Sequence, residues 1–280
     1  MITGIHSLYA IAVCSGQEHD RSSALPFAIS FAAAAGAHLT AHLAAIRLVL
    51  PSASGSSTIA GLVSAENGRI GAIADQRALS ARADAQAAGV ACTSCALHAS
   101  HAGIMSDVAR QTRVHDLTIV DGSQSTLDPA RSVAEAALFE GGRAVLISPP
   151  GVETFQCRRV VIAWDGSAMA SRAVASALPL LCAADKVEIL TIAGEKDLSG
   201  AASGADLAAH LAHHGVQVDV KDLPVGKRSA ADVLRDQASM LDADLIVMGA
   251  FKHSRLRQWI LGGVTASMLA ESPVPVLMSH

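Results

Sequence analysis

The sequence predicts an α/β protein made of two tandem domains, each with a doubly wound, five-stranded parallel sheet. Three observations lead to this prediction. The 280 residues of the chain are enough for about two domains. In the second half of the chain, short apolar runs alternate with segments of helical spacing. The first half of the chain then shows the same alternation.

Five apolar runs and four helical segments make up the second half. The expected strands are Arg159–Trp164, Val187–Ile192, Val216–Val220, Asp244–Met248 and Val274–Met278. The expected helices are Ala168–Cys182, Gly204–His214, Ser229–Leu241 and Arg255–Glu271. These strands are mainly apolar rather than alternating between apolar and polar residues. This is typical of a parallel sheet that helices cover on both faces.

The first half follows the same plan, which indicates a duplication. The matching segments are Ile11–Cys14 with Ile162–Asp165, Gly89–Val90 with Gly215–Val216, Asp116–Val120 with Asp244–Met248, and Ala144–Ile147 with Pro275–Met278. The offset falls from 151 to 128 along these matches, so the first half carries about 23 extra residues. We expect them between Pro51 and Ile73, where Ser, Gly and Asn cluster. Pro149-Pro150-Gly151 would then link a domain of residues 1–150 to one of residues 157–280.

Composition and charge exclude several classes of function. A net charge of −4 and only 16% charged residues argue against nucleic acid or an anionic membrane as partner. The longest apolar stretch, 24–50, is interrupted by Pro26, Gly36 and Arg47, so we expect no membrane span. Residues 1–10 show no signal-peptide pattern, and an odd number of cysteines, five, fits a reducing compartment. A cytoplasmic protein is the expectation.

The chemistry-bearing residues of the second half follow its first and fourth strands. Asp165-Gly166-Ser167 follows one strand, and Gly249 to His253 follows the other, with Gly262 to Thr265 further on. In doubly wound sheets, ligands bind beyond the carboxyl ends of the strands. Glycines let backbone amides approach phosphates, and a helix N-terminus adds partial positive charge. The aspartate can accept hydrogen bonds from ribose hydroxyls.

In this segment the chain resembles the universal stress protein family. ATP-binding members carry Gly-x-x-Gly, nine residues and then Gly-Ser/Thr, with an Asp after the first strand. Here Gly249, two residues, Lys252, nine residues and Gly262-Gly263 keep that spacing, with Lys252 and Gly263 departing from the pattern. Val264-Thr265 and the closing run 273–277 are also similar to the family. The resemblance spans essentially the whole chain and is clearest over 157–280.

The resemblance implies a Rossmann-like fold of the adenine nucleotide alpha hydrolase type and a non-enzymatic stress-response protein that binds ATP in its second half. The cofactor would be ATP, with magnesium accompanying it. The residues that it nominates for binding are Asp165, Ile192, Met248, Gly249, Lys252, His253, Gly262, Gly263, Val264 and Thr265. Among them, Ile192 and Met248 would line the adenine. Lys252 has two interpretations. Its ammonium could bind phosphate, or Lys252 could form the solvated start of a helix together with Arg255 and Arg257.

The first half lacks most of these groups. Cys14 stands where the alignment has Asp165, and no glycine follows Asp121-Gly122 at the motif spacing. We expect this half to serve as a structural partner domain with a degenerate nucleotide site. The resemblance further suggests that the two last strands, Ala144–Ser148 and Val274–Ser279, pair edge to edge. One chain would then mimic a dimer of single domains, and association of whole chains into a homodimer is a further expectation.

Other reactive residues are expected to be structural. Cys92, Cys95, His98 and His101 recur every third residue, but in a strand residues three apart point to opposite faces, which argues against a metal or redox site. A further set of histidines, expected on or near helices, has no carboxylate or cysteine beside it in the sequence: His38, His42, His210, His213 and His214. Ser167 is expected to cap a helix. One alternative is a docking module with both sites vestigial. The other is an enzyme of the wider nucleotide-binding superfamily, such as an adenylating enzyme, but no catalytic motif that it would require is found.

Overall fold

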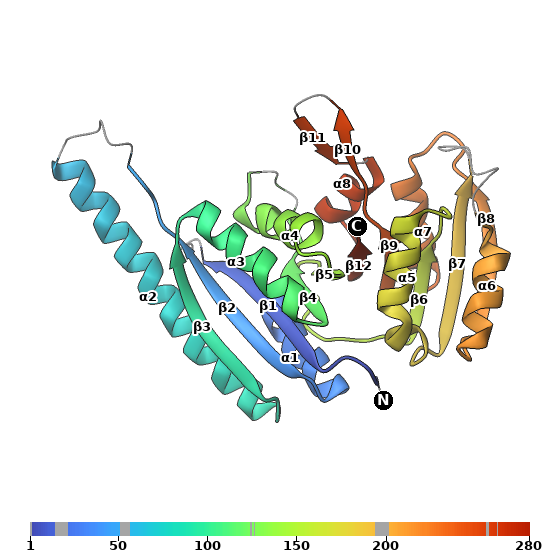
Figure 1. Ribbon diagram of the computed structural model, residues 1–280, viewed down its shortest axis with the longest axis horizontal. Helices are drawn as coiled ribbons and strands as arrows, with labels where there is room; N and C mark the ends of the chain where they lie inside the picture. Colours follow the sequence, from blue (N-terminus) through green and yellow to red (C-terminus); the bar gives the residue numbers. More distant parts are fainter. Residues whose placement is uncertain are drawn as a thin grey trace.

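The computed structural model contains one continuous ten-stranded sheet flanked by helices (Figure 1). The structure describes residues 2–14, 22–50, 57–123, 125, 127–193, 202–255, 258–261 and 263–280, and for 193, 252–255 and 258–261 it describes the backbone alone. The strands of the sheet are β1 (Ser7–Cys14), β2 (His38–Ile46), β3 (Cys92–Ala99), β4 (Leu117–Asp121), β5 (Val145–Ser148), β6 (Arg159–Ala163), β7 (Lys186–Ala193), β8 (Val218–Pro224), β9 (Leu245–Gly249) and β12 (Val276–Ser279). The helices are α1 (Ala24–Ala35), α2 (Ser57–Ala87), α3 (His101–Val114), α4 (Pro129–Glu140), α5 (Ala168–Leu181), α6 (Gly204–His213), α7 (Ala230–Met240) and α8 (Gly263–Ala270).

The order of the strands confirms the predicted fold class. It runs β3-β2-β1-β4-β5-β12-β9-β6-β7-β8, so each half of the chain contributes five neighbouring strands. Within each half all pairs are parallel. The two halves meet at β5 and β12, which pair antiparallel with Leu277 opposite Leu146. The predicted edge-to-edge pairing of the two last strands is therefore confirmed.

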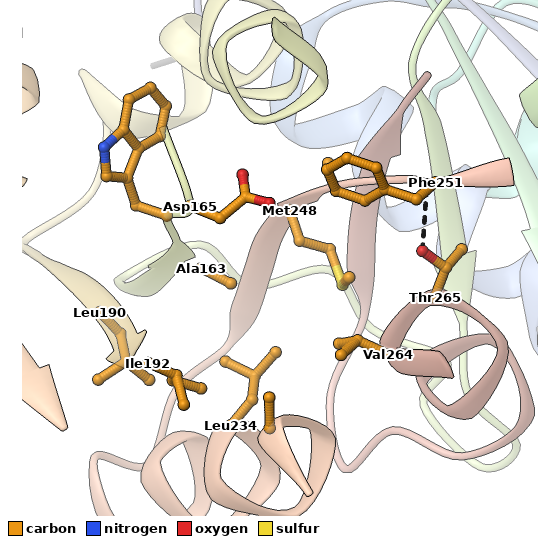
Figure 2. Close-up of a pocket in the computed structure, with 12 residues that line it drawn as sticks. Ala163, Asp165, Leu190, Ile192, Leu234, Met248, Phe251, Val264 and Thr265 are labelled. Carbon is orange, nitrogen blue, oxygen red and sulfur yellow. Dashed lines mark hydrogen bonds between the residues drawn. The ribbon is translucent and has the colours of Figure 1, made fainter. Parts of the chain in front are cut away.

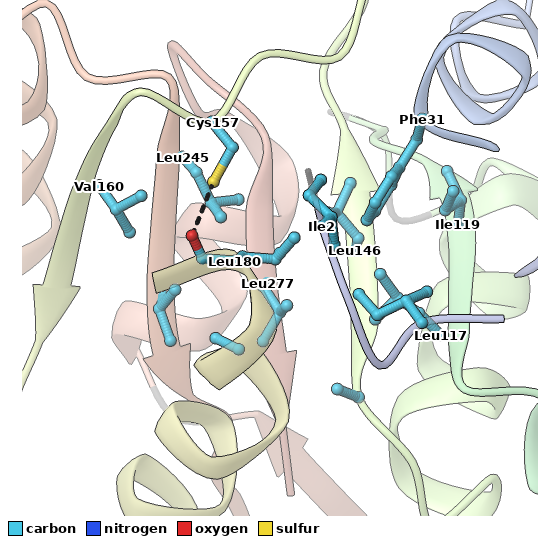
Figure 3. Close-up of a cluster of buried hydrophobic side chains, with 14 of the residues drawn as sticks. Ile2, Phe31, Leu117, Ile119, Leu146, Cys157, Val160, Leu180, Leu245 and Leu277 are labelled. Carbon is cyan, nitrogen blue, oxygen red and sulfur yellow. Dashed lines mark hydrogen bonds between the residues drawn. The ribbon is translucent and has the colours of Figure 1, made fainter. Parts of the chain in front are cut away.

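The helices cover both faces of the sheet, as predicted. One buried cluster packs beneath α1, α5 and α6, and a second packs beneath α3, α4, α7 and α8. The first cluster crosses the seam between the halves without a break. Figure 3 shows Leu117, Ile119 and Leu146 of the first half in the same layer as Leu245 and Leu277 of the second. The two halves thus share a core as well as a sheet.

One predicted helix is wrong at its N-terminal end. The sequence predicts Arg255–Glu271 as a single helix, but α8 begins only at Gly263. The preceding residues form a separate antiparallel hairpin of β10 (Lys252–Arg255) and β11 (Gln258–Leu261), which projects beyond the sheet in Figure 1. Leu261 lies opposite Lys252 in this hairpin. Residues 252–255 and 258–261 therefore form a protruding element between β9 and α8.

The extra residues of the first half form a helix. α2 has 31 residues, whereas α6, its counterpart after the second strand, has 10. The buried residues of α2 begin at Ile70, so the part before it extends past the sheet, as Figure 1 shows at the far end of the first half. Most of the predicted insertion, Pro51–Ile73, is thus helical from Ser57 onward. No helix among the described residues, α2 included, has the length and apolar character needed to cross a membrane.

Candidate functional site

A cavity of about 100 Å³ opens at the carboxyl ends of β6, β7 and β9 (Figure 2). β6 leads through α5 to β7 on one side, whereas β9 lies on its other side, so the cavity is at the point where the strand order reverses. Ligands of doubly wound sheets bind at this point. The described residues that line the cavity are Ala163, Trp164, Asp165, Leu190, Ile192, Ala230, Leu234, Met248, Gly249, Phe251, Val264 and Thr265.

The structure brings six of the ten nominated residues together around this cavity. They are Asp165, Ile192, Met248, Gly249, Val264 and Thr265. Gly263 begins α8 next to them but is not part of the lining. Lys252 and His253 lie on β10 of the hairpin, so the interpretation of Lys252 as the start of a helix is wrong. The interpretation of its ammonium as a contact for phosphate stays a prediction. Gly262 and Arg257 lie outside the described residues.

The sequence analysis identified only some of the residues that form the apolar walls of the cavity. Ile192 was nominated, and Leu190, two residues earlier on β7, lines the same cavity because alternate residues of a strand share a face. Ala230 and Leu234, four residues apart on α7, line the cavity together. These two periodicities were signals that could have revealed the missed residues. Phe251 gave no such signal, because a loop places it.

Thr265 fixes the segment that follows β9. Its side-chain oxygen accepts a hydrogen bond from the backbone amide of Phe251 at 3.0 Å (Figure 2), and the residue is only 1% exposed. Both residues line the cavity, so this bond ties the first turn of α8 to the end of β9. The hydroxyl of Thr265 therefore has a structural partner.

Gly249 has a packing role that differs from the expected one. A Cβ atom at this position would lie 2.6 Å from the backbone nitrogen of Ala170 and 2.8 Å from the carbonyl carbon of Met169. The first turn of α5 thus packs directly on the backbone of β9, and only glycine leaves room for it. Gly263 is different, because nothing lies within 4 Å of the position that its Cβ would take.

Asp165 stands at the mouth of the cavity, just after β6. One of its carboxylate oxygens accepts a hydrogen bond from the backbone amide of Ser167 at 3.2 Å, and in Figure 2 the carboxylate lies beside Met248. Ser167 in turn caps α5, because its hydroxyl accepts from the amide of Ala170 at 3.1 Å. The prediction that Ser167 is a helix cap is confirmed. The turn presents a partly exposed carboxylate to the cavity.

The universal stress protein family model matches residues 156–280, the half that contains this cavity. Residues 156–280 are therefore a universal stress protein domain. The universal stress protein Slr1230 of Synechocystis is 29% identical over 134 residues, which cover 47% of this chain and 45% of that relative. The matched segment therefore spans about half of that relative's length.

Solved universal stress proteins extend the similarity of fold to both halves. One from Archaeoglobus fulgidus has a TM-score of 0.68 at 18% identity and covers 97% of each chain. A putative universal stress protein from Pseudomonas aeruginosa has a TM-score of 0.57 at 14% identity and covers 99% of this chain and 94% of its own. At such low identity these similarities concern the fold alone.

The strand register corrects the alignment of the two halves of the chain by one residue. In the first half Leu8 pairs with Leu117, and in the second half Val160 pairs with Leu245, so these pairs correspond. Counting forward along β1 and β6, the counterpart of Asp165 is Val13, not Cys14. The predicted loss of the ribose acceptor holds, since valine also has no carboxylate.

The same register shows what replaces Gly249 in the first half. Its counterpart is Asp121, the last residue of β4. One carboxylate oxygen of Asp121 accepts hydrogen bonds from the backbone amides of Ser23 and Ala24, at 2.8 and 2.9 Å. These amides open α1, the counterpart of α5. A carboxylate of the protein thus occupies the helix terminus that would otherwise be open to an anion.

His42 contradicts the expectation that it lies near a helix with no carboxylate beside it. It lies on β2, and its Nδ1 is 3.1 Å from Asp107 Oδ2 and 3.2 Å from the hydroxyl of Tyr9. Burial lowers the pKa of His42, and the neighbouring Asp107 raises it in part. His42 corresponds to Leu190 in the register, so a buried polar network stands where the second half has a wall of its cavity.

Cys92 and Cys95 lie on β3, as predicted. Cys92 is half-buried whereas Cys95 is exposed, and residues three apart in a strand point to opposite faces. Among the residues that the structure describes, no group of three or more His, Cys, Asp or Glu side chains could hold a metal ion. Nothing in this segment converges on a common ligand position.

Proposed function

We propose that the second half of this chain binds an adenine nucleotide, ATP in the first place, and that the bound state acts as a signal in a stress response. The observation that carries this proposal is the cavity at the reversal of strand order, with apolar walls and one carboxylate at its mouth. A base needs apolar surfaces on its faces, and a ribose needs an acceptor for its hydroxyls. Ile192 and Met248 supply apolar surfaces for the base, and Asp165 supplies an acceptor for the ribose hydroxyls.

The described residues enclose only part of such a ligand. A cavity of about 100 Å³ is smaller than the roughly 300–1,000 Å³ of typical small-molecule sites. We therefore assign the cavity to the base and place the phosphates outside it, toward the start of α8. Nothing lies within 4 Å of the Cβ position of Gly263, and α8 begins at this residue, where the helix dipole favours an anion. Magnesium would accompany the phosphates as their counter-ion.

The protein is proposed to act without catalysis in the cytoplasm. Asp165 is the one carboxylate among the described cavity residues, and no histidine, cysteine or lysine stands among them to serve as a base or nucleophile. All five cysteines are free thiols, the state that a reducing cytoplasm maintains.

Calorimetric titration of the purified protein with MgATP tests the proposal. We expect one site per chain. Asp165→Asn keeps an oxygen for the amide of Ser167 and removes the charge, so it should weaken binding without unfolding the turn. Ala163→Leu should fill the cavity and abolish binding. Asp185→Asn, an exposed change just before the amino end of β7, is the matched control and should bind as the unaltered protein does.

The alternative is a docking module whose two nucleotide sites are both vestigial. The hairpin of β10 and β11 favours it, because this hairpin stands in the segment where the family has its phosphate loop. No heat of binding at millimolar MgATP, together with no nucleotide released on denaturing the purified protein, would establish the docking module and reject the proposed nucleotide site.

A further inference from the structure

Helix α8, which lines the cavity, is held from both sides by arginine side chains. On one side Arg235 of α7 donates to the carbonyl oxygens of Ser267 and Glu271, each at 3.0 Å. On the other side Arg131 of α4 donates from Nη1 to the carbonyl oxygen of Ala266 at 3.4 Å. Arg235 belongs to the same half as α8, but Arg131 belongs to the first half. The two halves therefore meet at the helix that carries Val264 and Thr265.

Arg131 is buried, which is unusual for an arginine. Its side chain is 7% exposed, and its Nε lies 2.8 Å from a carboxylate oxygen of Glu135 in the same helix. A guanidinium withdrawn from water needs partners for its charge and for its N–H groups. Glu135 supplies a negative charge, and the carbonyl oxygen of Ala266 supplies an acceptor from the second half of the chain. The contact with α8 is thus part of what makes this burial tolerable.

A short chain of contacts leads from Arg131 to the cavity. Ala266 follows Thr265 directly in α8, and Thr265 accepts the hydrogen bond from the amide of Phe251. Phe251, Val264 and Thr265 together line one side of the cavity. A shift of α8 at Ala266 would move Thr265 with it, because helix backbone is stiff over two residues. The wall formed by Phe251 would then lose its anchor.

We propose that Arg131 is a positioning residue by which the first half of the chain holds the nucleotide site of the second half in its binding geometry. The inference deepens the proposed function and rests on it for the ligand. It explains why a half with a degenerate site of its own can still matter for binding. Removal of the guanidinium would break the hydrogen bond to Ala266 and weaken the hold on α8 at the side that faces α4.

The test combines hydrogen exchange of the ligand-free protein with MgATP titration, using Arg131→Met. Methionine retains an apolar stem of similar length, and Glu135, whose side chain is 41% exposed, can be hydrated. We expect the amide of Phe251 to exchange about tenfold faster and MgATP to bind about tenfold more weakly, as for the loss of one charge-assisted hydrogen bond. Arg131→Lys keeps a donor and should restore part of both effects. Arg69→Met, which breaks an exposed ion pair within α2, is the control and should change neither.

The outcomes separate this inference from the proposed function. A folded Arg131→Met protein with unchanged exchange at Phe251 would overturn the inference, whatever the ATP affinity. If the unaltered protein binds no MgATP, the proposed function fails. Hydrogen exchange of the ligand-free protein then still decides whether Arg131 positions the cavity wall formed by Phe251. Should Arg131→Met not fold, Arg131→Lys is decisive. Faster exchange in that variant supports the inference, and exchange at the unaltered rate overturns it.

Discussion

Asp116 and Asp244 occupy equivalent positions in the two halves and make the same pair of backbone hydrogen bonds. Asp116 Oδ2 accepts from the amides of His6 and Ser7 at 2.9 Å each. Asp244 Oδ2 accepts from the amides of Arg158 and Arg159 at 2.8 Å each. Each aspartate directly precedes the fourth strand of its half and fixes the start of the first strand beside it. The repeated contact independently supports the register that places Val13 opposite Asp165.

Gly249 and Gly263 are expected to respond oppositely to substitution. Gly249→Ala places a methyl group 2.6 Å from the backbone of Ala170, so α5 must move. We expect a loss of about 1–3 kcal/mol in the free energy of unfolding, the usual range for overpacking. Gly263→Ala meets open space in the first turn of α8 and should be neutral or stabilising by up to about 1 kcal/mol. Urea denaturation of both variants measures the difference, and equal losses would contradict the packing role of Gly249.

Thr265→Val tests the hydrogen bond that anchors Phe251. Valine keeps the shape of the side chain but removes the acceptor for a partly buried amide. We expect a loss of about 1–3 kcal/mol in the free energy of unfolding and weaker MgATP binding, measured by denaturation and calorimetry on the same samples. Thr93→Val, an exposed change on β3, is the control. Unchanged stability in Thr265→Val would show that the amide finds another partner.

The strands of this fold could be predicted because their sequences are unambiguous. Runs such as 245–248 are apolar and short and contain β-branched residues, and burial on both faces leaves few other structures for them. The hairpin could not be predicted in the same way. Trp259, Ile260 and Leu261 form an apolar run that fits a strand or a helix equally well, and tertiary context decides between them.

In the candidate site, too, local sequence predicts some features whereas tertiary contacts determine others. The resemblance to the family located Asp165, Gly249 and Thr265, because local sequence fixes the turns after β6 and β9. Contacts between distant segments left no trace in the sequence. Asp107 is 65 residues from His42, and Arg131 is 135 residues from Ala266, so only the fold reveals that they meet. The interpretation of isolated histidines failed at His42 for this reason.

Asp121→Asn should change how stability depends on pH. Burial raises the pKa of Asp121 above its ordinary value, although hydrogen bonds from Ser22, Ala24 and Ser23 lower it in part. As the pH rises from about 4, the unfolded chain therefore loses this proton before the folded protein does. The unaltered protein should lose stability relative to Asp121→Asn over that window. Urea denaturation from pH 3.5 to 7 measures this difference, with Asp84→Asn as an exposed control. If the unaltered protein instead gained stability relative to Asp121→Asn as the pH rises, the prediction would be contradicted.

His42→Asn should remove a loss of stability in mild acid. Burial lowers the pKa of His42, and Arg110 and His115 act in the same direction, while Asp107 opposes them. The unfolded chain, with an ordinary histidine pKa of about 6.5, binds the proton first as the pH falls. The folded protein should therefore lose stability between about pH 7 and pH 5.

Asparagine at position 42 keeps a polar group near Tyr9 and Asp107 but does not titrate. The loss of stability with falling pH should therefore be smaller in His42→Asn than in the unaltered protein. Thermal unfolding at half-unit steps of pH measures both curves. His38→Asn changes an exposed histidine on the same strand and should follow the unaltered protein. Parallel curves for His42→Asn and the unaltered protein would show that His42 protonates equally in the folded and unfolded states. The network with Tyr9 and Asp107 would then be open to water, and its burial beneath α3 would not control its charge.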